Sequence, residues 1–215
     1  MHRTRSVSSI FDLIHHFESF KMSNYTTADE NAADIALLKS KFAFHQDFPK
    51  KGIYFCDVFP AFRDPLTLEL LITHFVSHIF NVTIPKLAKG GKIDTVVGLD
   101  ARGFLIGPII ASRLGAAFVP VRKAGKLPGK CAKASYAKEY GEDVFEIQSD
   151  SIAKGANVIV VDDLIATGGS AKAAGELVQQ LGAKTLEYLF IVGGSNLNGA
   201  AKLDAPAYSL VDIEL

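Results

Sequence analysis

The segment Val158–Ser170, which reads VIVVDDLIATGGS, constrains the fold more than any other part of the chain. Its four leading apolar residues, mostly β-branched, predict a buried strand. Two adjacent carboxylates, Asp162 and Asp163, follow where that strand is expected to end, and a small-residue loop then opens a helical pattern. Ligands of open α/β sheets bind at the carboxyl ends of strands, and helix N-termini attract anions. The segment therefore predicts a site for a phosphorylated sugar.

Strand and helix patterns alternate along the rest of the chain, which favours a doubly wound, mostly parallel sheet flanked by helices, an α/β fold. Asp64 followed by Pro65 predicts a helix start, and the polar stretch Arg122–Ser135 predicts an exposed loop before an extended hairpin at Tyr136–Ile147. The remaining strand patterns are Ile53–Phe55, Thr95–Leu99, Phe118–Val121, Thr185–Val192 and Tyr208–Ile213, and the remaining helical ones are Asp34–Phe44, Phe104–Leu114 and Ala171–Leu181.

Composition excludes several classes of protein. The 23 basic and 23 acidic residues balance, so no nucleic-acid partner is expected. No apolar run reaches the roughly 18 residues that span a bilayer, so no membrane partner is expected either. The only cysteines, Cys56 and Cys131, are too few for a disulfide framework or a metal cluster and fit a reducing compartment, which favours the cytoplasm.

The first 21 residues differ from the rest, because they carry Arg3, Arg5 and several serines ahead of a second methionine, Met22. Arginine and serine are typical of a transit peptide, but acids are not, so Asp12 and Glu18 weaken the prediction of a targeting role for residues 1–21 without excluding it. Residues 1–21 are therefore either a dispensable extension or an ordinary helix, and residues 22–215 are expected to form one domain.

An apolar strand that ends in two aspartates is also typical of the magnesium-binding strand of P-loop NTPases. That interpretation requires G-x-x-x-x-G-K-[ST] upstream. The Gly-Lys pairs begin at Gly91, Gly125 and Gly129, and none has a glycine five positions earlier. Nucleoside triphosphate hydrolysis is therefore not expected.

Further cations and small residues indicate which other groups the predicted ligand carries. The loop Ala166–Ser170 offers backbone N–H groups and two hydroxyls but no lysine, which suits a terminal monophosphate. Gly98–Phe104 repeats the order of strand, loop and helix and carries Arg102 at the strand end. Three more cations, Arg122, Lys123 and Lys126, follow the next strand. A ligand with a phosphate, sugar hydroxyls and a second polyanion would fit all of them.

The motif VVDDLIATGGS resembles the signature with which type I phosphoribosyltransferases bind phosphoribosyl pyrophosphate (PRPP). Three further segments resemble the members of that family that act on adenine: FPKKGIYFCD from Phe48, GLDARGF from Gly98 and RKAGKLPGKCAKASYAKEYG from Arg122. The resemblance covers about Phe44–Leu215. It implies the type I phosphoribosyltransferase fold with a mobile lid hairpin, and an enzyme of purine salvage that converts adenine and PRPP into AMP and pyrophosphate.

The resemblance also implies roles for individual residues around PRPP or AMP. Asp162 and Asp163 would bind the ribose hydroxyls and favour an oxocarbenium-like transition state. The pyrophosphate loop would contain a non-proline cis peptide and would include Arg102, which counts with the two aspartates among the catalytic residues. Mg²⁺ would be held through PRPP and water, without direct ligation by the protein. The 5′-phosphate would be held by Ala166, Thr167, Gly168, Gly169 and Ser170, and the pyrophosphate by Asp100, Ala101, Arg102, Arg122, Lys123 and Lys126.

Adenine would be recognised by backbone groups of Tyr54 and Cys56. The resemblance places its ring between Phe55 and Leu164. Many relatives carry a charged residue where this chain has Cys56, so only a backbone role is carried over there.

The resemblance makes Lys126–Tyr140 a lid that closes over the reaction and excludes water. Within it, Glu139 would act as the general acid or base near N7 of adenine, and Tyr140 would help to position the lid. A homodimer is implied as well.

Two alternatives remain open from the sequence. The same chemistry on another base, such as xanthine, hypoxanthine or orotate, is disfavoured by FPKKGIYFCD. A PRPP-sensing regulator without catalysis would usually add a DNA-binding domain, and the residues before Phe44 show no basic recognition helix.

Overall fold

The computed structural model describes residues 28–138 and 141–215. The chain divides into the units Met1–Asp34 and Ile35–Leu215, and the second unit contains both sheets. The elements are α2 (Ala28–Lys41), β1 (Ala43–Gln46), β2 (Tyr54–Asp57), α3 (Phe59–Phe62), α4 (Pro65–His78), the π-helical η1 (Ile79–Leu87), β3 (Thr95–Leu99), α5 (Gly103–Leu114), β4 (Ala117–Lys123), β5 (Cys131–Lys138), β6 (Gly141–Gln148), β7 (Asn157–Ile165), α6 (Gly169–Gln180), β8 (Lys184–Gly194), the 3₁₀ turn η2 (Gly199–Lys202) and β9 (Ala207–Ile213).

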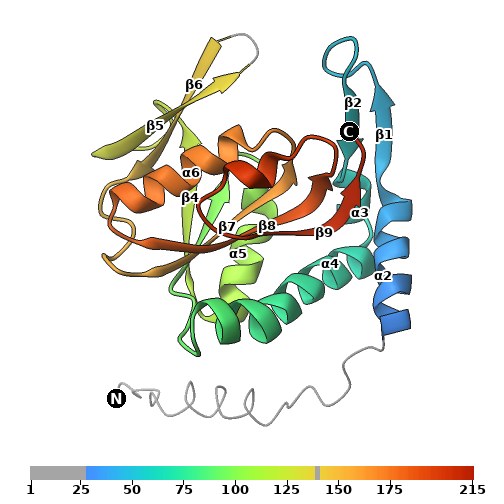
Figure 1. Cartoon of the computed structure of the whole chain (residues 1–215), viewed down its shortest axis with the longest axis horizontal. Helices are drawn as coiled ribbons and strands as arrows, with labels where there is room; N and C mark the ends of the chain where they lie inside the picture. Colours follow the sequence, from blue (N-terminus) through green and yellow to red (C-terminus); the bar gives the residue numbers. More distant parts are fainter. Residues whose placement is uncertain (1–27, 139–140) are drawn as a thin grey trace, which may run out of the picture. The chain divides into compact units, whose positions relative to one another are not determined.

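The main sheet has seven strands in the order β5-β6-β4-β3-β7-β8-β9. The five strands from β4 to β9 in this order run parallel, while β5 and β6 form an antiparallel hairpin that pairs with the end of β4. A separate antiparallel pair joins β1 to β2. The predicted doubly wound, mostly parallel sheet is confirmed, and the predicted hairpin forms its outer edge (Figure 1).

The two central strands feed helices on opposite faces of the sheet. In β7, Ile159 and Val161 point into the core cluster that includes α5, and Val158 and Val160 point into the cluster that includes α6. Because β3 continues through α5 to β4, whereas β7 continues through α6 to β8, the strand order reverses between β3 and β7. Such a reversal leaves a crevice at the carboxyl ends of the strands, where α/β proteins bind ligands.

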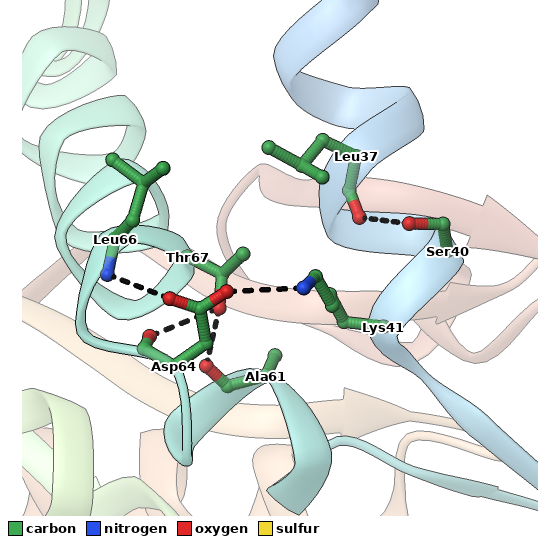
Figure 2. A network of polar contacts seen from close by, with 7 residues as sticks. All are labelled: Leu37, Ser40, Lys41, Ala61, Asp64, Leu66 and Thr67. Carbon is green, nitrogen blue, oxygen red and sulfur yellow. Dashed lines mark hydrogen bonds and ion pairs between the residues drawn. The ribbon is translucent and has the colours of Figure 1, made fainter.

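Helix α4 begins as Asp64 and Pro65 predict. The Asp64 carboxylate accepts a hydrogen bond from Leu66 N at 3.0 Å and also from Lys41 Nζ at 3.0 Å, at the end of α2 (Figure 2). Thr67 Oγ1 donates to the carbonyl of Ala61 at 2.6 Å, which joins the start of α4 to α3. One aspartate therefore caps the helix and ties it to the neighbouring α2.

The helical stretch Pro65–Leu87 is the one helix in the described part of the chain that is long and apolar enough to cross a membrane by length and composition. Its side chains Leu71, Phe75 and Ile79 are fully buried in the core of Ile35–Leu215. This burial is typical of a core helix that covers one face of a sheet.

The structure corrects two predicted boundaries. Phe44 does not end a helix; it lies in β1, because it pairs with Cys56 across the small sheet and its ring stacks on Tyr54. The polar stretch Arg122–Ser135 is only partly a loop. Its ends belong to β4 and β5, because pairing with β6 satisfies the backbone groups of polar residues there.

Strand β7 is also longer than predicted. Asp162 and Asp163 lie within it, because pairing with β8 continues as far as Ile165 opposite Gly193. Pairing with β3 stops earlier, with Gly98 opposite Val161. The two aspartates are therefore held by β8 on one side and open toward the crevice on the other.

Candidate active site

A cavity of about 270 Å³ lies at the carboxyl ends of β3 and β7. Most of its lining comes from the end of β7 and from the loop that leads into α6. The lining residues are Asp100, Arg102, Lys123, Tyr136, Phe145, Asp162, Asp163, Leu164, Ile165, Ala166, Thr167, Gly168, Gly169, Ser170, Ala171 and Phe190.

The loop Ala166–Ser170 bends tightly around Gly168 to start α6. Gly168 has φ +80°, and a Cβ added there would lie 2.3 Å from the carbonyl oxygen of Gly199. Only glycine fits both the left-handed backbone and this close approach. The bend places the N-terminus of α6 at the cavity, where free backbone N–H groups and the helix dipole favour an anion.

The paired aspartates point to opposite faces of β7, as successive residues of a strand do. Asp163 is 3% exposed, and its carboxylate forms an ion pair with Arg102 Nε. Asp162 accepts a hydrogen bond from the backbone N–H of Asp163 at 2.9 Å. Burial, and next the negative charge of Asp163, raise the pKa of Asp162 well above its usual range.

The loop after β3 brings Arg102 and Asp100 to the same cavity. The peptide bond between Asp100 and Ala101 is cis, as the resemblance implies. Arg122 Nε donates to Asp100 Oδ2 at 2.8 Å. The Arg102 guanidinium carbon lies 5.8 Å from the ring centroid of Phe55, so this side chain contacts Asp163 on one side and an aromatic face on the other.

A second cavity of about 260 Å³ adjoins the first and is largely apolar. Cys56 lines it and is 2% exposed, and burial, followed by the charges of Asp163 and Asp57, raises the pKa of its thiol to about 11. Three residues, Arg102, Leu164 and Ala166, line both cavities. The full lining is Gly52, Ile53, Tyr54, Phe55, Cys56, Arg102, Leu164, Ala166, Leu197 and Leu215.

The structure brings most of the predicted site residues to these two cavities. Three of them, Ala101, Arg122 and Lys126, line neither cavity. Glu139 and Tyr140 lie outside the described residues. The residues at the first cavity are Asp100, Arg102, Lys123, Asp162, Asp163 and Ala166–Ser170, and those at the second are Tyr54, Phe55, Cys56 and Leu164.

Sequence reasoning missed Leu197 and Leu215 as lining residues. Both follow strands whose carboxyl ends reach the same edge of the sheet, since Gly194 of β8 pairs with Ile213 of β9. The rule that ligands bind at that edge could have identified them once the strand order was known.

No group of three or more histidine, cysteine, aspartate and glutamate side chains is arranged to hold a metal in residues 28–138 and 141–215. His78, one of two histidines a helical turn apart, contacts Glu187 Oε1 through Nε2 at 2.9 Å and stacks on Tyr208. It is therefore a packed histidine of the core face.

Comparisons with known proteins agree with this geometry. The family model for the phosphoribosyl transferase domain matches residues 68–214. The chain is 56% identical to adenine phosphoribosyltransferase of Yarrowia lipolytica over 81% of this chain and 93% of that protein. It is 53% identical to adenine phosphoribosyltransferase 1 of Saccharomyces cerevisiae over 81% of this chain and 91% of that protein.

Solved structures of this family share the fold. The crystal structure of the Saccharomyces cerevisiae enzyme, complexed with D-2,5-dideoxy-2,5-imino-altritol 1,6-bisphosphate and adenine, superposes with a TM-score of 0.79 at 52% identity over 84% of this chain and 99% of that chain. The Rhodothermus marinus enzyme superposes with a TM-score of 0.75 at 35% identity over 85% and 99% of the two chains. This chain thus belongs to the adenine phosphoribosyltransferases, the type I phosphoribosyltransferases that convert adenine and PRPP into AMP and pyrophosphate.

Proposed function

We propose that the two adjoining cavities divide the substrates of this enzyme, with PRPP in the first and adenine in the second. The observation that carries the proposal is their shared wall of Arg102, Leu164 and Ala166, because a bond between two substrates must form where their sites meet. The yeast relative is complexed with a bisphosphate and adenine together, which supports two neighbouring sites.

The 5′-phosphate of PRPP would bind at Ala166–Ser170. This loop presents the backbone N–H groups of Gly168 and Gly169 and the hydroxyls of Thr167 and Ser170 close to the start of α6. The ribose hydroxyls would then reach the carboxylates of Asp162 and Asp163, which lie directly before the loop on β7. The order of groups along the chain matches the order of groups along the substrate.

Pyrophosphate would lie toward Asp100, Arg102 and Lys123, on the β3 side of the cavity. Arg102 pairs there with Asp163 through Nε, and its guanidinium, which has five N–H donors, could bind an incoming polyanion while it keeps this pair. Mg²⁺ would be held there by PRPP oxygens and water without direct ligation by the protein, since no group of three or more ligating side chains is arranged to hold it in residues 28–138 and 141–215. When bound, Mg²⁺ would neutralise charge on the departing pyrophosphate.

Adenine would lie between Phe55 and Leu164 in the apolar cavity, with backbone groups of Tyr54 and Cys56 along its edge. The thiol of Cys56 remains protonated at neutral pH because its pKa is raised to about 11, so it brings no charge to the base. An uncharged base fits this apolar cavity better than orotate, which carries a carboxylate.

The reaction forms a bond between a ring nitrogen of adenine and C1′ and breaks the bond from C1′ to the pyrophosphate oxygen. Positive charge that develops on the sugar ring would be stabilised by the carboxylates of Asp162 and Asp163. Glu139, which follows β5, would take up the proton that adenine loses, and closure of Lys126–Tyr140 would exclude water.

The decisive test is a steady-state assay with adenine, PRPP and Mg²⁺, run in parallel with hypoxanthine, xanthine and orotate. We expect AMP to form from adenine and little product from the other bases. Absence of turnover on adenine would refute the assignment. Glu139→Ala should lower kcat by 10² or more, roughly the size of a general acid–base contribution, while Glu69→Ala, on the exposed face of α4, should not.

The same assay on residues 22–215 tests the proposed domain boundary. Every residue assigned to the substrates lies after Met22, so we expect the shortened chain to keep the activity of the full one. A loss of turnover without a loss of folded structure would assign a role to residues 1–21.

We further propose a homodimer located in the cytoplasm. Exposed apolar side chains at Leu66, Phe80 and Leu105 lie on α4, η1 and α5, and a second copy would remove such surface from water. Both cysteines are free, as expected in a reducing compartment. Sedimentation at several concentrations and cell fractionation test these two proposals, and a monomer or an organelle-bound pool would refute them.

A further inference from the structure

One of the residues that line the second cavity, Leu215, lies two residues after the end of β9. The same cavity is lined by Leu197 and by three residues of β2. We propose that Leu215, held in place by Asn196, determines how tightly the base binds and how large a purine is admitted. This inference rests on the assignment of adenine to the second cavity.

The side-chain amide of Asn196 clamps the backbone of Leu215. Its Nδ2 donates to the carbonyl oxygen of Leu215 at 2.7 Å, and its Oδ1 accepts from Leu215 N at 3.1 Å. Two bonds from one planar amide fix both the position and the orientation of the residue that they hold. Ser195 adds bonds from its N–H and its hydroxyl to the carbonyl of Ile213, at 2.9 and 3.1 Å.

The end of β8 leaves room for the Leu215 side chain. A Cβ added at Gly194 would lie 2.8 Å from Leu215 Cδ1, so the leucine packs directly over a backbone that has no side chain. Leu215 also packs against the core cluster on the α4 and α5 face. The hydrogen bonds to its backbone, the space left by Gly194 and the contacts with the core therefore hold the Leu215 side chain at the cavity.

An apolar wall in this position acts on the base in two ways. It removes apolar surface of the ring from water, which strengthens binding, and it excludes substituents that would need its volume. In a hydrophobic pocket one methylene group changes binding about tenfold or more. Leu215 does not contact the first cavity, so its effect should be confined to the base.

Three substitutions separate the wall from its supports. Leu215→Ala removes the wall, Asn196→Ala removes both hydrogen bonds of the clamp, and Gly194→Ala keeps both residues but displaces the leucine. We expect each to raise KM for adenine, about tenfold for Leu215→Ala, with KM for PRPP unchanged within about twofold. Leu215→Met, which conserves volume, should restore most of the affinity.

A base panel supplies a second readout. With adenines that carry a methyl group at C2, N6 or C8, Leu215→Ala should raise the ratio of kcat/KM for at least one methylated base to that for adenine. Phe59→Ala, which truncates an apolar side chain that is 42% exposed and lines neither cavity, is the control and should leave KM for adenine and the base preference unchanged.

The possible results separate this inference from the proposed function. A wild-type protein that makes no AMP refutes the proposed function. An active wild-type protein whose Leu215→Ala and Asn196→Ala variants keep the wild-type KM for adenine and base preference refutes the inference. A rise in KM for PRPP that equals the rise for adenine also refutes it. Thermal unfolding of each variant shows whether the protein measured is folded. If Leu215→Ala or Asn196→Ala fails to fold, Gly194→Ala takes its place in the same assays.

Discussion

Arg102 and Asp163 form an ion pair at the wall between the two cavities, with Arg102 Nε against the Asp163 carboxylate. The carboxylate is almost fully buried, whereas the guanidinium is about one-third exposed. In this pair the Asp163 carboxylate is shielded from water, whereas the Arg102 guanidinium remains accessible to a ligand. Because a guanidinium has five N–H donors, Arg102 can keep this pair through Nε while its exposed part contacts another anion.

Replacing Arg102 with Met leaves Asp163 buried without its cation. We expect the free energy of unfolding to fall by about 1–3 kcal/mol and KM for PRPP to rise. Arg113→Met is the matched control, because it breaks the exposed bidentate pair with Glu69 at 2.8 and 2.9 Å. That pair should contribute only about 0–1 kcal/mol. Urea unfolding followed by circular dichroism measures both, and equal losses would contradict the prediction.

The raised pKa of Asp162 predicts a trade-off between stability and activity. A carboxyl group with a raised folded pKa holds its proton more tightly in the folded state, so stability is lost as pH rises above the unfolded pKa of 3.8 and through the folded pKa. Asp162→Asn removes this loss. We expect the variant to be more stable than the wild type at pH 7, with the advantage fading toward about pH 4.

Activity should change in the opposite direction. Asp162→Asn replaces a carboxyl group that we assign to the ribose and to the charge that develops on it, so kcat should fall about 10²-fold or more. Unfolding free energies from pH 4 to 8, together with kcat at pH 7, test both statements. A stability difference that does not vary with pH would show that Asp162 titrates normally.

Asp64 predicts the opposite dependence on pH. Hydrogen bonds from Lys41 and then from the Leu66 amide lower the pKa of its carboxyl group, so its stabilisation is present above pH 3.8 and is lost as pH falls through the lowered pKa. Asp64→Asn keeps an acceptor for the amide but loses the charge. At pH 7 we expect the urea midpoint to be highest for the wild type, lower for Asp64→Asn and lowest for Asp64→Ala. In acid the midpoints of the wild type and Asp64→Asn should become equal. Equal midpoints for both variants would exclude a capping role.

Local patterns predicted much of this fold, and tertiary pairing decided the rest. The strand Thr95–Leu99 was predicted with its observed bounds, because a short apolar run before a glycine-containing loop leaves little choice. Phe44 was assigned to a helix since its partner Cys56 lies beyond a turn that local periodicity does not register. The wall formed by Leu215 depends on β9 lying beside β8, which is a property of the sheet and not of the segment.

Cys56 should be inert although it lines a substrate cavity. Its thiol is 2% exposed and its pKa is raised to about 11, so hardly any reactive thiolate forms at pH 8. Cys131 is partly exposed and provides the internal control. We expect iodoacetamide to alkylate Cys131 in the folded protein and Cys56 only after unfolding, as read by mass spectrometry of peptides. Labelling of both at similar rates would contradict this.

Gly168 tests whether the shape of the loop Ala166–Ser170, which we propose to hold the 5′-phosphate, is required for binding PRPP. A side chain at this position would meet both a left-handed backbone and the carbonyl of Gly199 at 2.3 Å, so Gly168→Ala must displace the loop from the start of α6. We expect KM for PRPP to rise by about 10²-fold, as loss of charge-assisted hydrogen bonds worth about 3 kcal/mol implies, with a much smaller change for adenine.

Gly155→Ala separates this effect from ordinary backbone strain. Gly155 also has a positive φ, of +77°, but a Cβ there meets nothing within 4 Å, and the residue lines neither cavity. The left-handed backbone alone should reduce stability by about 1–2 kcal/mol and leave both KM values unchanged. If the two alanine variants impair PRPP binding equally, the close approach to Gly199 has no special role; a defect confined to Gly168→Ala ties the binding of the 5′-phosphate to the geometry of this one bend.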